Sequence, residues 1–399
     1  MSHKLFTINR RKWMMLSGAT FGMRYGSAQP QQSTAPGRAD LSKVPPDKLL
    51  LKDYRPKSIY KIPKTEVRKA KFPVIDVHCH GARPPERIAE MVKNMEAVGL
   101  ERTVIFTGAA TAEKFSEIAR PYVKYPGRFD LWCGFNLAGA DEPGFGPNAI
   151  KSLEACHQAG ARGVGEIVDK GYGLGRSVGS GPPGWPGRGQ PAGKMGPHPD
   201  DPRLDPLFQR CAQLGMPINI HVSDPIWAYL PQDYTNDGLM DSFDWRLDDK
   251  SGILGHDGLL QGLERAVQKH PLTIFIACHF ANLDYDLTRL GQMFERNANF
   301  YADISARYAE TAPIPRFVAQ FYQKYSDRLL YGTDLGFSQE MYRLTFRFLE
   351  TEDEHFYEMD EFQHHWPLHC FGLPDDVLKK VYRDNALAVF ARARDNAKA

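Results

Sequence analysis

Two histidines stand at the end of a short apolar segment, 74–81, which reads VIDVHCHG. The segment is predicted to be a buried strand, on which alternate side chains share one face, so the imidazoles of His78 and His80 should point the same way. Two imidazoles held about one strand repeat apart can chelate one divalent cation and leave positions open for water and substrate. The pair therefore predicts metal chemistry.

Other polar residues follow apolar runs farther along the chain. Glu166, His221, His279 and Asp334 each stand at or near the end of such a run. All are residue types that bind zinc-like ions. A random scatter of 13 histidines would not place four of them at the ends of apolar runs. The combination predicts a metal centre assembled from several strands.

These residues are carried by strand-length apolar runs with little strict alternation, as expected of parallel strands that are buried on both faces. The runs cover residues 74–80, 102–108, 129–137, 161–168, 217–222, 273–280, 300–306 and 329–336. Segments with helical spacing lie between them, and Gly99, Gly160 and Gly215 fall where helix ends would need a glycine. The alternation predicts an α/β fold, a TIM barrel of eight parallel strands, with catalytic groups at the carboxyl ends of the strands.

The chain resembles the amidohydrolase superfamily, and more closely its amidohydrolase-related branch, amidohydrolase 2, which includes metal-dependent hydrolases and some carboxylate decarboxylases. The resemblance runs from about Phe72 to Phe390. Its motifs are DVHCH at 76–80, IHV at 220–222, ACHF at 277–280, YGTD at 331–334, and the closing stretch from LPDD at 373–376 to Asn385 and Ala386. The combination is far more specific than any one motif.

The family pattern implies a role for each matching residue. His78 and His80 would bind the first ion, and Asp334 would bind it too and take a proton from the attacking water. A divalent ion, with zinc expected here, can bring the pKa of water from about 15.7 to about 7. His221 resembles the third imidazole ligand, whereas His279 in single-metal members polarises the substrate or water.

Glu166 departs from the commonest family pattern, because many relatives carry a carboxylated lysine there as a bridge between two ions. A glutamate can bridge in the same way, and His221 and His279 would then hold a second ion. Otherwise Glu166 would be a hydrogen-bond acceptor behind the ligands or a substrate contact. The resemblance favours one ion, and two remain open.

Structural rather than catalytic roles are expected for three neighbours of these residues. Asp76 should accept hydrogen bonds within the barrel rather than bind metal. Cys79 and Cys278, with the opposite strand parity to the ligands, should be small buried fillers rather than nucleophiles.

Substrate contacts are expected from residues that follow the strands. Arg307 and Arg83 could hold a substrate carboxylate by a bidentate contact, and a surface salt bridge is the equal alternative. Trp227, after the fifth strand, is a further candidate. The stretch from His364 to Trp366 could also line the barrel mouth, although surface or structural roles are the better interpretation.

The segment 171–196 is rich in glycine and proline and long for a strand-to-helix loop. It could be a lid over the metal, anchored by Trp185, or an insertion without regular structure. It lacks the lysine followed by serine or threonine that nucleotide-binding loops require.

Composition bounds the remaining questions. The 399 residues are 42% hydrophobic and 25% charged, ordinary values for a globular enzyme, and a barrel of about 250 residues plus loops would account for most of one domain at 72–399. Fifty basic and 48 acidic residues give a net charge of +2, so nucleic acid is not an expected partner.

The first 28 residues differ from the rest. Arg10, Arg11 and Lys12 precede a short apolar stretch at 13–23, and small residues follow at 26–28. This pattern predicts a twin-arginine-type export signal, and hence a periplasmic or extracellular protein; an unprocessed leader would leave it cytoplasmic. The stretch is too short to span a bilayer, so no integral membrane segment is expected in the mature protein. Residues 29–71 are polar and proline-rich and should run extended over the barrel or be partly disordered.

The function expected is that of a metal-dependent hydrolase, which uses a metal-activated water on an ester, lactone or amide bond of a small organic substrate. Asp334 would carry the proton, and His279 would help to stabilise the developing oxyanion. The alternative is a metal-dependent decarboxylase of an aromatic or unsaturated carboxylic acid, which a cationic Arg307 would favour. The substrate and the oligomeric state stay open, a homo-oligomer included.

Overall fold

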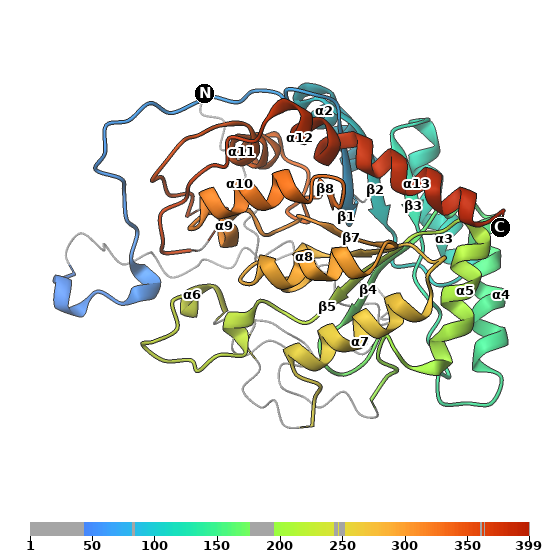
Figure 1. Cartoon of the computed structure of the whole chain (residues 1–399). Helices are drawn as coiled ribbons and strands as arrows, with labels where there is room; N and C mark the ends of the chain where they lie inside the picture. The colour runs from blue at the N-terminus through green and yellow to red at the C-terminus, as the bar shows by residue number, and fades with distance from the viewer. Residues whose placement is uncertain are drawn as a thin grey trace, which may run out of the picture.

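The computed structural model describes residues 44–81, 84–175, 195–242, 246, 252–359, 361–362 and 364–398. Within them, the predicted barrel of eight parallel strands alternating with helices is confirmed (Figure 1). The strands are β1 (Val74–Cys79), β2 (Leu100–Phe106), β3 (Phe129–Trp132), β4 (Val164–Asp169), β5 (Ile218–Val222), β6 (Phe275–Ala277), β7 (Phe300–Asp303) and β8 (Leu329–Leu330). Several are shorter than their apolar runs, so some site residues follow a strand rather than belong to it.

Two contacts close the strands into a ring. The strands pair in two runs, β1-β2-β3 and β4-β5-β6-β7-β8. Cys133, directly after β3, forms a parallel bridge with Val164 of β4. On the other side, the Val77 N–H of β1 donates to the Tyr331 carbonyl at 2.9 Å. Closure brings the carboxyl ends of all the strands to one rim.

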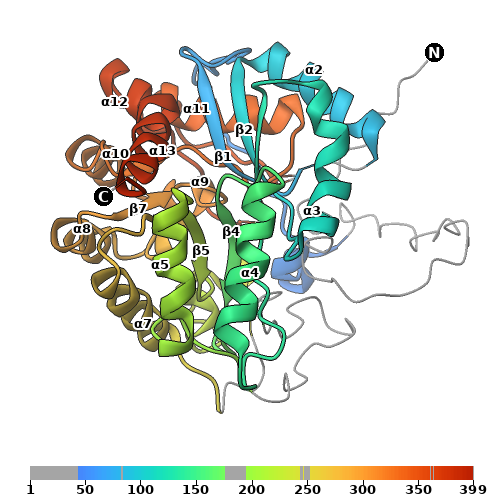
Figure 2. The ribbon, with the colours of Figure 1, turned by 90° about the vertical axis from the view of Figure 1, so that its right-hand side faces the viewer.

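Helices surround the barrel, as Figures 1 and 2 show from two sides. They are α2 (Pro85–Val98), α3 (Ala112–Ala119), α4 (Phe145–Gln158), α5 (Asp205–Leu214), α7 (His256–Lys269), α8 (Leu287–Arg296), α10 (Pro315–Lys324) and α11 (Gln339–Glu350), followed by α12 (Asp375–Lys379) and α13 (Asn385–Asn396). Two short helices, α6 (Leu239–Ser242) and α9 (Tyr308–Thr311), lie in loops after β5 and β7. As predicted, α2 and α5 end at the left-handed glycines Gly99 and Gly215, and Gly160 follows α4 closely.

Single turns complete the elements. They are the 3-10 turns η2 (Pro46–Lys48), η3 (Leu51–Asp53), η4 (Arg120–Lys124), η5 (Pro202–Leu204), η6 (Ile226–Ala228) and η7 (His279–Asn282), and the π-turn η8 (Lys380–Asp384).

The apolar core has two layers. The larger lies between the strands and the surrounding helices. The second contains Val77, Phe106 and Trp132 from the first three strands, with Val389 and Phe390 of α13 packed against them. The ring of Phe106 lies 4.9 Å from the ring of His78, between centroids. This second layer therefore packs against the imidazole of His78.

The N-terminal part of the description, residues 44–71, is mostly exposed and has only the turns η2 and η3. It is held to the barrel by Thr65, whose N–H and hydroxyl donate to Asp353 at 2.8 and 2.6 Å. The predicted export signal, Arg83 and Trp185 fall outside the described residues, and so does most of the segment 171–196.

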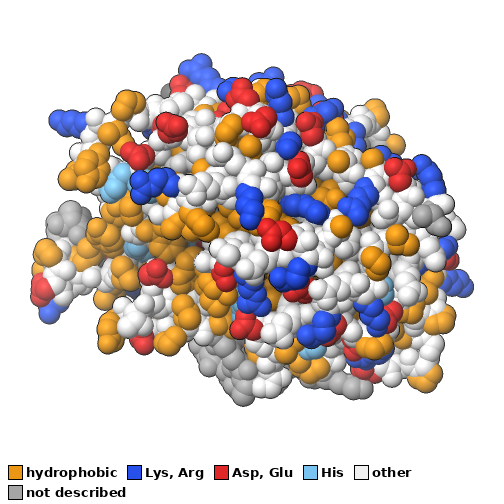
Figure 3. All heavy atoms as spheres, viewed as in Figure 1, with side chains coloured by type: hydrophobic (Ala, Val, Ile, Leu, Met, Phe, Trp, Pro, Cys, Tyr) orange, Lys and Arg blue, Asp and Glu red, His pale blue; other side chains and the backbone are white. Residues whose placement is uncertain are grey.

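Two further observations concern partners. None of the helices in the described ranges is both long enough and apolar enough to cross a membrane. On the face in Figure 3, the described basic and acidic side chains are interspersed rather than separated by sign.

The contact between Gly163 and Trp132 gives a test of the barrel packing. A Cβ at Gly163 would overlap the buried indole ring of Trp132. We expect Gly163→Ala to lower the free energy of unfolding by about 1–3 kcal/mol, the usual cost of overpacking. Gly146, in α4, has open space around its Cβ position, so Gly146→Ala is the matched control and should not destabilise. Equal unfolding curves for both variants and the parent, in guanidinium, would contradict the packing described.

Candidate metal centre

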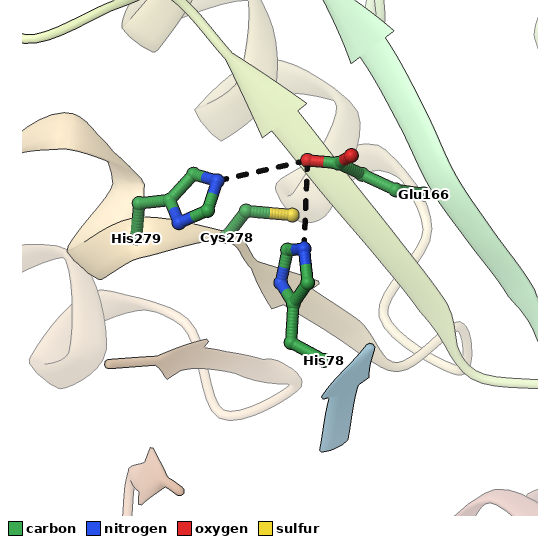
Figure 4. Close-up of side chains that lie close together, drawn as sticks. All are labelled: His78, Glu166, Cys278 and His279. Carbon is green, nitrogen blue, oxygen red and sulfur yellow. Dashed lines mark ion pairs between the residues drawn. The ribbon is translucent and has the colours of Figure 1, made fainter. Parts of the chain in front are cut away.

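The polar side chains predicted at the strand ends meet at one place on the rim of the barrel. They are the imidazoles and carboxylates of His78, His80, Glu166, His221, His279 and Asp334. Figure 4 shows His78 of β1 and His279, after β6, pointing toward the carboxylate of Glu166 on β4. Because these residues come from opposite parts of the ring, only its closure brings them together.

Glu166 lies at the centre of the group. Its Oε1 is 2.7 Å from Nδ1 of His221, 3.7 Å from Nε2 of His279 and 3.8 Å from Nε2 of His78. Its Oε2 is 3.5 Å from Nε2 of His80. One carboxylate thus faces all four imidazoles.

Asp334 supplies the second carboxylate. Its Oδ1 lies 3.1 Å from Nε2 of His80 and 3.6 Å from Nε2 of His78, and its Oδ2 lies 3.7 Å from Nε2 of His279. The backbone N–H of Asp334 donates to the His78 carbonyl at 3.0 Å, which fixes the residue against β1. Asp334 therefore shares three of the four imidazoles with Glu166.

The orientation of each imidazole is fixed by its outer ring nitrogen, the one that points away from the shared carboxylates; the inner nitrogen is the one that faces them. Nδ1 of His279 lies 2.9 Å from the Ser305 carbonyl, and Nε2 of His221 lies 2.9 Å from the Ser223 carbonyl. A carbonyl only accepts, so these nitrogens carry the protons. Nδ1 of His78 likewise faces Oδ2 of Asp303 at 2.9 Å. The inner Nδ1 of His221 lies at hydrogen-bond distance, 2.7 Å, from Oε1 of Glu166, so a bound cation would displace a proton there. With an ion bound, the inner nitrogens would present lone pairs to it, as metal-binding histidines do.

A lone pair that faces a carboxylate is repelled unless a proton or a cation lies between them. His78 Nε2 is buried and has no hydrogen-bond partner among the described residues. For His78, His80 and His279, the separations of 3.1–3.8 Å between ring nitrogens and carboxylate oxygens suit ligands around an ion with bonds of about 2.0–2.2 Å. The ligand atoms of His78, His80 and Asp334 lie within 4.8 Å of one another. The residues present therefore fit a divalent cation.

The electrostatics of the site keep both carboxylates ionised. Burial opposes ionisation, yet His78 and His80 lower the pKa of Asp334 to about 2. Against the same effect of burial, His221 and its neighbours hold the pKa of Glu166 well below its usual range. The carboxylates of Asp303, Asp334 and Glu166 in turn overcome burial and raise the pKa of His78 to about 10. A cation would compete with these protons, so metal binding should release them.

His279 differs from His78. Burial is the main cause that lowers the pKa of His279 to about 4, and the charge of Arg307 acts in the same direction. Its imidazole is therefore neutral at physiological pH.

The backbone turns sharply where the site residues stand. Ser223, His279 and Asp334 have φ angles of 70°, 59° and 51°, in the left-handed region that non-glycine residues rarely adopt. Such residues cost on the order of 1–3 kcal/mol each and tend to occur where function requires them. Here the turns follow β5, β6 and β8 and direct the chain along the rim.

The interpretation of Asp76 agrees with its contacts. Its carboxylate accepts from the His78 N–H at 3.0 Å, from the Thr333 hydroxyl at 2.7 Å and from the Tyr342 hydroxyl at 3.2 Å. Burial raises the pKa of Asp76 to about 6. Asp76 thus connects β1 to the segment that carries Asp334.

Two features of the site escape sequence reasoning. Asp303, at the end of β7, accepts from the N–H groups of His279 and Ser305 and faces His78 Nδ1. The position of Asp303 at the end of an apolar run could have identified it in the sequence as a candidate site residue. Cys278 was expected to point away from the site, but its sulfur belongs to a group with His78, Glu166 and His279. The reason is that β6 ends at Ala277, so strand parity no longer applies; burial raises the pKa of its thiol well above the usual value.

Of the predicted substrate residues, Arg307 is buried. Its Nε lies 3.4 Å from Asp284, its Nη1 lies 3.5 Å from Glu310, and its Nη2 donates to Asn282. Trp227 packs on Trp366 with ring centroids 5.6 Å apart.

The comparisons with known proteins agree with this architecture. The chain belongs to the amidohydrolase family, whose sequence model matches residues 75–392. No curated protein matches the chain at a significant level.

Several solved structures are similar to the chain. An uncharacterised TIM-barrel protein from Bordetella bronchiseptica is 16% identical, with 81% of this chain and 100% of that chain covered and a TM-score of 0.47. The 5-carboxyvanillate decarboxylase of Sphingomonas paucimobilis is 13% identical, over 80% of this chain and 99% of its own, with a TM-score of 0.46. The 4-oxalomesaconate hydratase of Rhodopseudomonas palustris is 15% identical, over 82% of this chain and 98% of its own, with a TM-score of 0.45. Likenesses this distant say nothing about the reaction.

The contact between Asp303 and His78 yields a prediction on metal affinity. The side-chain amide of Asp303→Asn can take two orientations. In one, its NH2 group faces His78 and drives the ring proton to Nε2, the nitrogen that faces the ion. In the other, its NH2 group opposes the backbone N–H groups of His279 and Ser305. We expect a 10- to 100-fold weaker affinity for zinc, on the order seen when such supporting residues are changed. Asp327→Asn, at an exposed ion pair with Lys380, is the control. Chelator competition gives the dissociation constants, and equal values for the two variants would exclude this role for Asp303.

Proposed function

We propose that the protein is a metal-dependent hydrolase of esters, lactones or amides of small organic molecules. The observation that carries the proposal is the position of Asp334, a carboxylate at the rim that borders His78, His80 and His279. A carboxylate in that place can take a proton from a water that attacks a substrate bound over the rim.

The residues proposed to hold the ion are His78, His80, His221, Asp334 and Glu166, and zinc is the ion proposed for a set of nitrogen and oxygen ligands. A divalent ion supplies Lewis acidity and brings the pKa of water to about 7. One ion is proposed, as the family resemblance implies. Glu166, which lies near the inner nitrogens of all four histidines, would be the bridging residue if a second ion were bound.

His279 is proposed to act after Asp334. Its Nδ1 proton is engaged by the Ser305 carbonyl, so neutral Nε2 can accept a proton but cannot donate one. Oδ2 of Asp334 lies 3.7 Å from that nitrogen. A proton passed from Asp334 would turn Nε2 into a donor toward the developing oxyanion or the leaving group, and this supports the pair as the catalytic residues.

Decarboxylation is the less supported reaction. It gained weight in the sequence from an arginine that could hold a substrate carboxylate. The guanidinium of Arg307 is instead surrounded by Asp284, Glu310 and Asn282, which leaves it little capacity for a further anion. Trp227 and Trp366, packed together after β5 and near α9, support an organic substrate with a flat apolar part.

The role of Asp334 can be tested by a change that keeps the shape of the side chain. Asp334→Asn cannot accept the proton, so we expect turnover to fall by about 10²- to 10⁴-fold, the usual contribution of a general base. Asp376→Asn, on the exposed side of α12, is the control and should turn over as the parent does. Metal content is measured on both, because Asp334 is also a proposed ligand. Undiminished turnover of the Asn variant would remove Asp334 as the base.

The reaction class can be tested with isotopes. Zinc-loaded protein is incubated in ¹⁸O-labelled water with panels of aryl esters, lactones, anilides and hydroxybenzoic acids. Hydrolysis places ¹⁸O in a carboxylic acid product, whereas decarboxylation releases carbon dioxide and leaves a proton from solvent on carbon. We expect the former with at least one ester, lactone or amide. Carbon dioxide release from an aromatic acid, without turnover of the other panels, would replace the hydrolase by the lyase.

A further inference from the structure

A second group of potential ligands lies in the loops beyond the barrel rim. It contains Asp241 on α6, Glu310 on α9 and His364 in the segment after α11. Nε2 of His364 lies 3.3 Å from Oδ1 of Asp241 and 3.8 Å from Oε1 of Glu310. The relative exposures are 7%, 4% and 2% respectively, so the group is shielded from solvent. We call it the loop cluster.

The loop cluster repeats the features that identify the barrel centre. Neither ring nitrogen of His364 has a hydrogen-bond partner within the described ranges, and neither does Oδ2 of Asp241. In the barrel centre, His78 Nε2 has the same property and faces carboxylate oxygens at 3.6 and 3.8 Å. A buried imidazole without hydrogen bonds is costly unless another group satisfies it.

The charges around the loop cluster favour a cation. Arg307 lies beside it, 3.5 Å from Glu310 and 3.4 Å from Asp284. Burial raises the pKa of Asp284 to about 7, so protonation can neutralise this carboxylate. The carboxylates of Asp241 and Glu310 are both buried beside His364, where a positive charge is favoured.

We propose that Asp241, Glu310 and His364 bind a second divalent cation of the zinc or manganese type, separate from the ion of the barrel centre. One imidazole and two carboxylates form a ligand set that suits such ions. Their separations of 3.3 and 3.8 Å are those of ligands around an ion with bonds of about 2.0–2.2 Å. Three protein ligands leave room for water as the fourth.

The ion would fasten three loops to one another at the mouth of the barrel. The ligands come from three separate loops, after β5, β7 and β8. Strand pairing fixes where these loops begin but does not fix their positions relative to one another. The ring of Trp366 packs at a tilt against that of His364, with centroids 4.5 Å apart, and Trp366 donates to the Ala309 carbonyl at 3.0 Å. The aromatic pair of Trp366 and Trp227 is therefore attached directly to the loop cluster.

Arg307, which forms an ion pair with Glu310 of the loop cluster, also begins a chain of hydrogen bonds that reaches the barrel centre. Arg307 donates to Asn282, and the side-chain amide of Asn282 donates to the Val222 carbonyl at 2.8 Å and to the Ser223 carbonyl at 3.3 Å. The Ser223 carbonyl is also the acceptor for His221. The loop ion is thus a positioning element for the mouth and does not depend on which reaction the barrel centre performs.

The first test measures metal content by elemental analysis of the full chain after zinc loading and removal of excess ion. We expect His364→Asn to hold one equivalent of zinc fewer than the parent. The neighbouring His365, whose ring stacks on Tyr54 at 6.2 Å outside the loop cluster, provides the control, and His365→Asn should keep the full content. Unchanged zinc in the His364 variant would overturn the proposal and leave an ion pair of His364 with Asp241. The double variant His78→Ala, His80→Ala should retain the loop ion, which distinguishes the two sites.

The second test uses the unaltered protein and so does not depend on the variants folding. Crystals grown from zinc-loaded protein are measured above and below the zinc absorption edge. We expect an anomalous peak bounded by Asp241, Glu310 and His364, in addition to the peak in the barrel centre. A filled barrel centre without a peak in the loop cluster would refute the second site.

Discussion

The structure depends on a group of buried carboxylates and imidazoles at the rim of the barrel, whose charges are balanced by protons or by a bound cation. Glu166 and Asp334 hold ionised carboxylates 2.7–3.8 Å from imidazole nitrogens, and the outer nitrogens of His221 and His279 are committed to backbone carbonyls. The inner nitrogens face these oxygens, and without an ion protons must charge buried imidazoles, as the raised pKa of His78 shows. A divalent cation can instead accept lone pairs from several of the imidazoles at once. The site is arranged for such a cation.

Barrel closure and local backbone turns supply that arrangement. The site side chains come from β1, β4, β5 and β7 and from the residues that follow β1, β6 and β8, so no ligand needs a long loop to reach the others. The left-handed turns at His279 and Asp334 come directly after short strands, and Asp76 connects β1 to the Thr333 hydroxyl beside Asp334. The cost of these turns is offset by the packing of two apolar layers around them.

Sequence reasoning reached the barrel and its inward ligands because both depend on local patterns, the apolar runs and the polar residues that follow them. It did not reach the orientation of Cys278, since that depends on where β6 stops, which hydrophobicity alone does not mark. It also gave Asp303 no role, because the pairing of Asp303 with His78 requires knowing that the strands close into a ring. The loop cluster could not be predicted for a further reason. Asp241, Glu310 and His364 come together through loops, and loops lack the hydrophobic periodicity from which strands and helices are predicted.

The fate of Arg307 shows why a residue type alone does not decide a reaction. An arginine after β7 can bind a substrate anion only if its guanidinium is not already neutralised. Here Asp284 and Glu310 face it from two loops, its Nη1 donates to the Ala306 carbonyl and its Nη2 donates to Asn282. Its charge is therefore used within the protein, to balance the carboxylates of the mouth and to hold the segment that carries the Ser223 carbonyl. Under the proposed function, selection of the substrate would fall to Trp227 and Trp366 at the mouth, and the chemistry to the carboxylates and imidazoles of the rim.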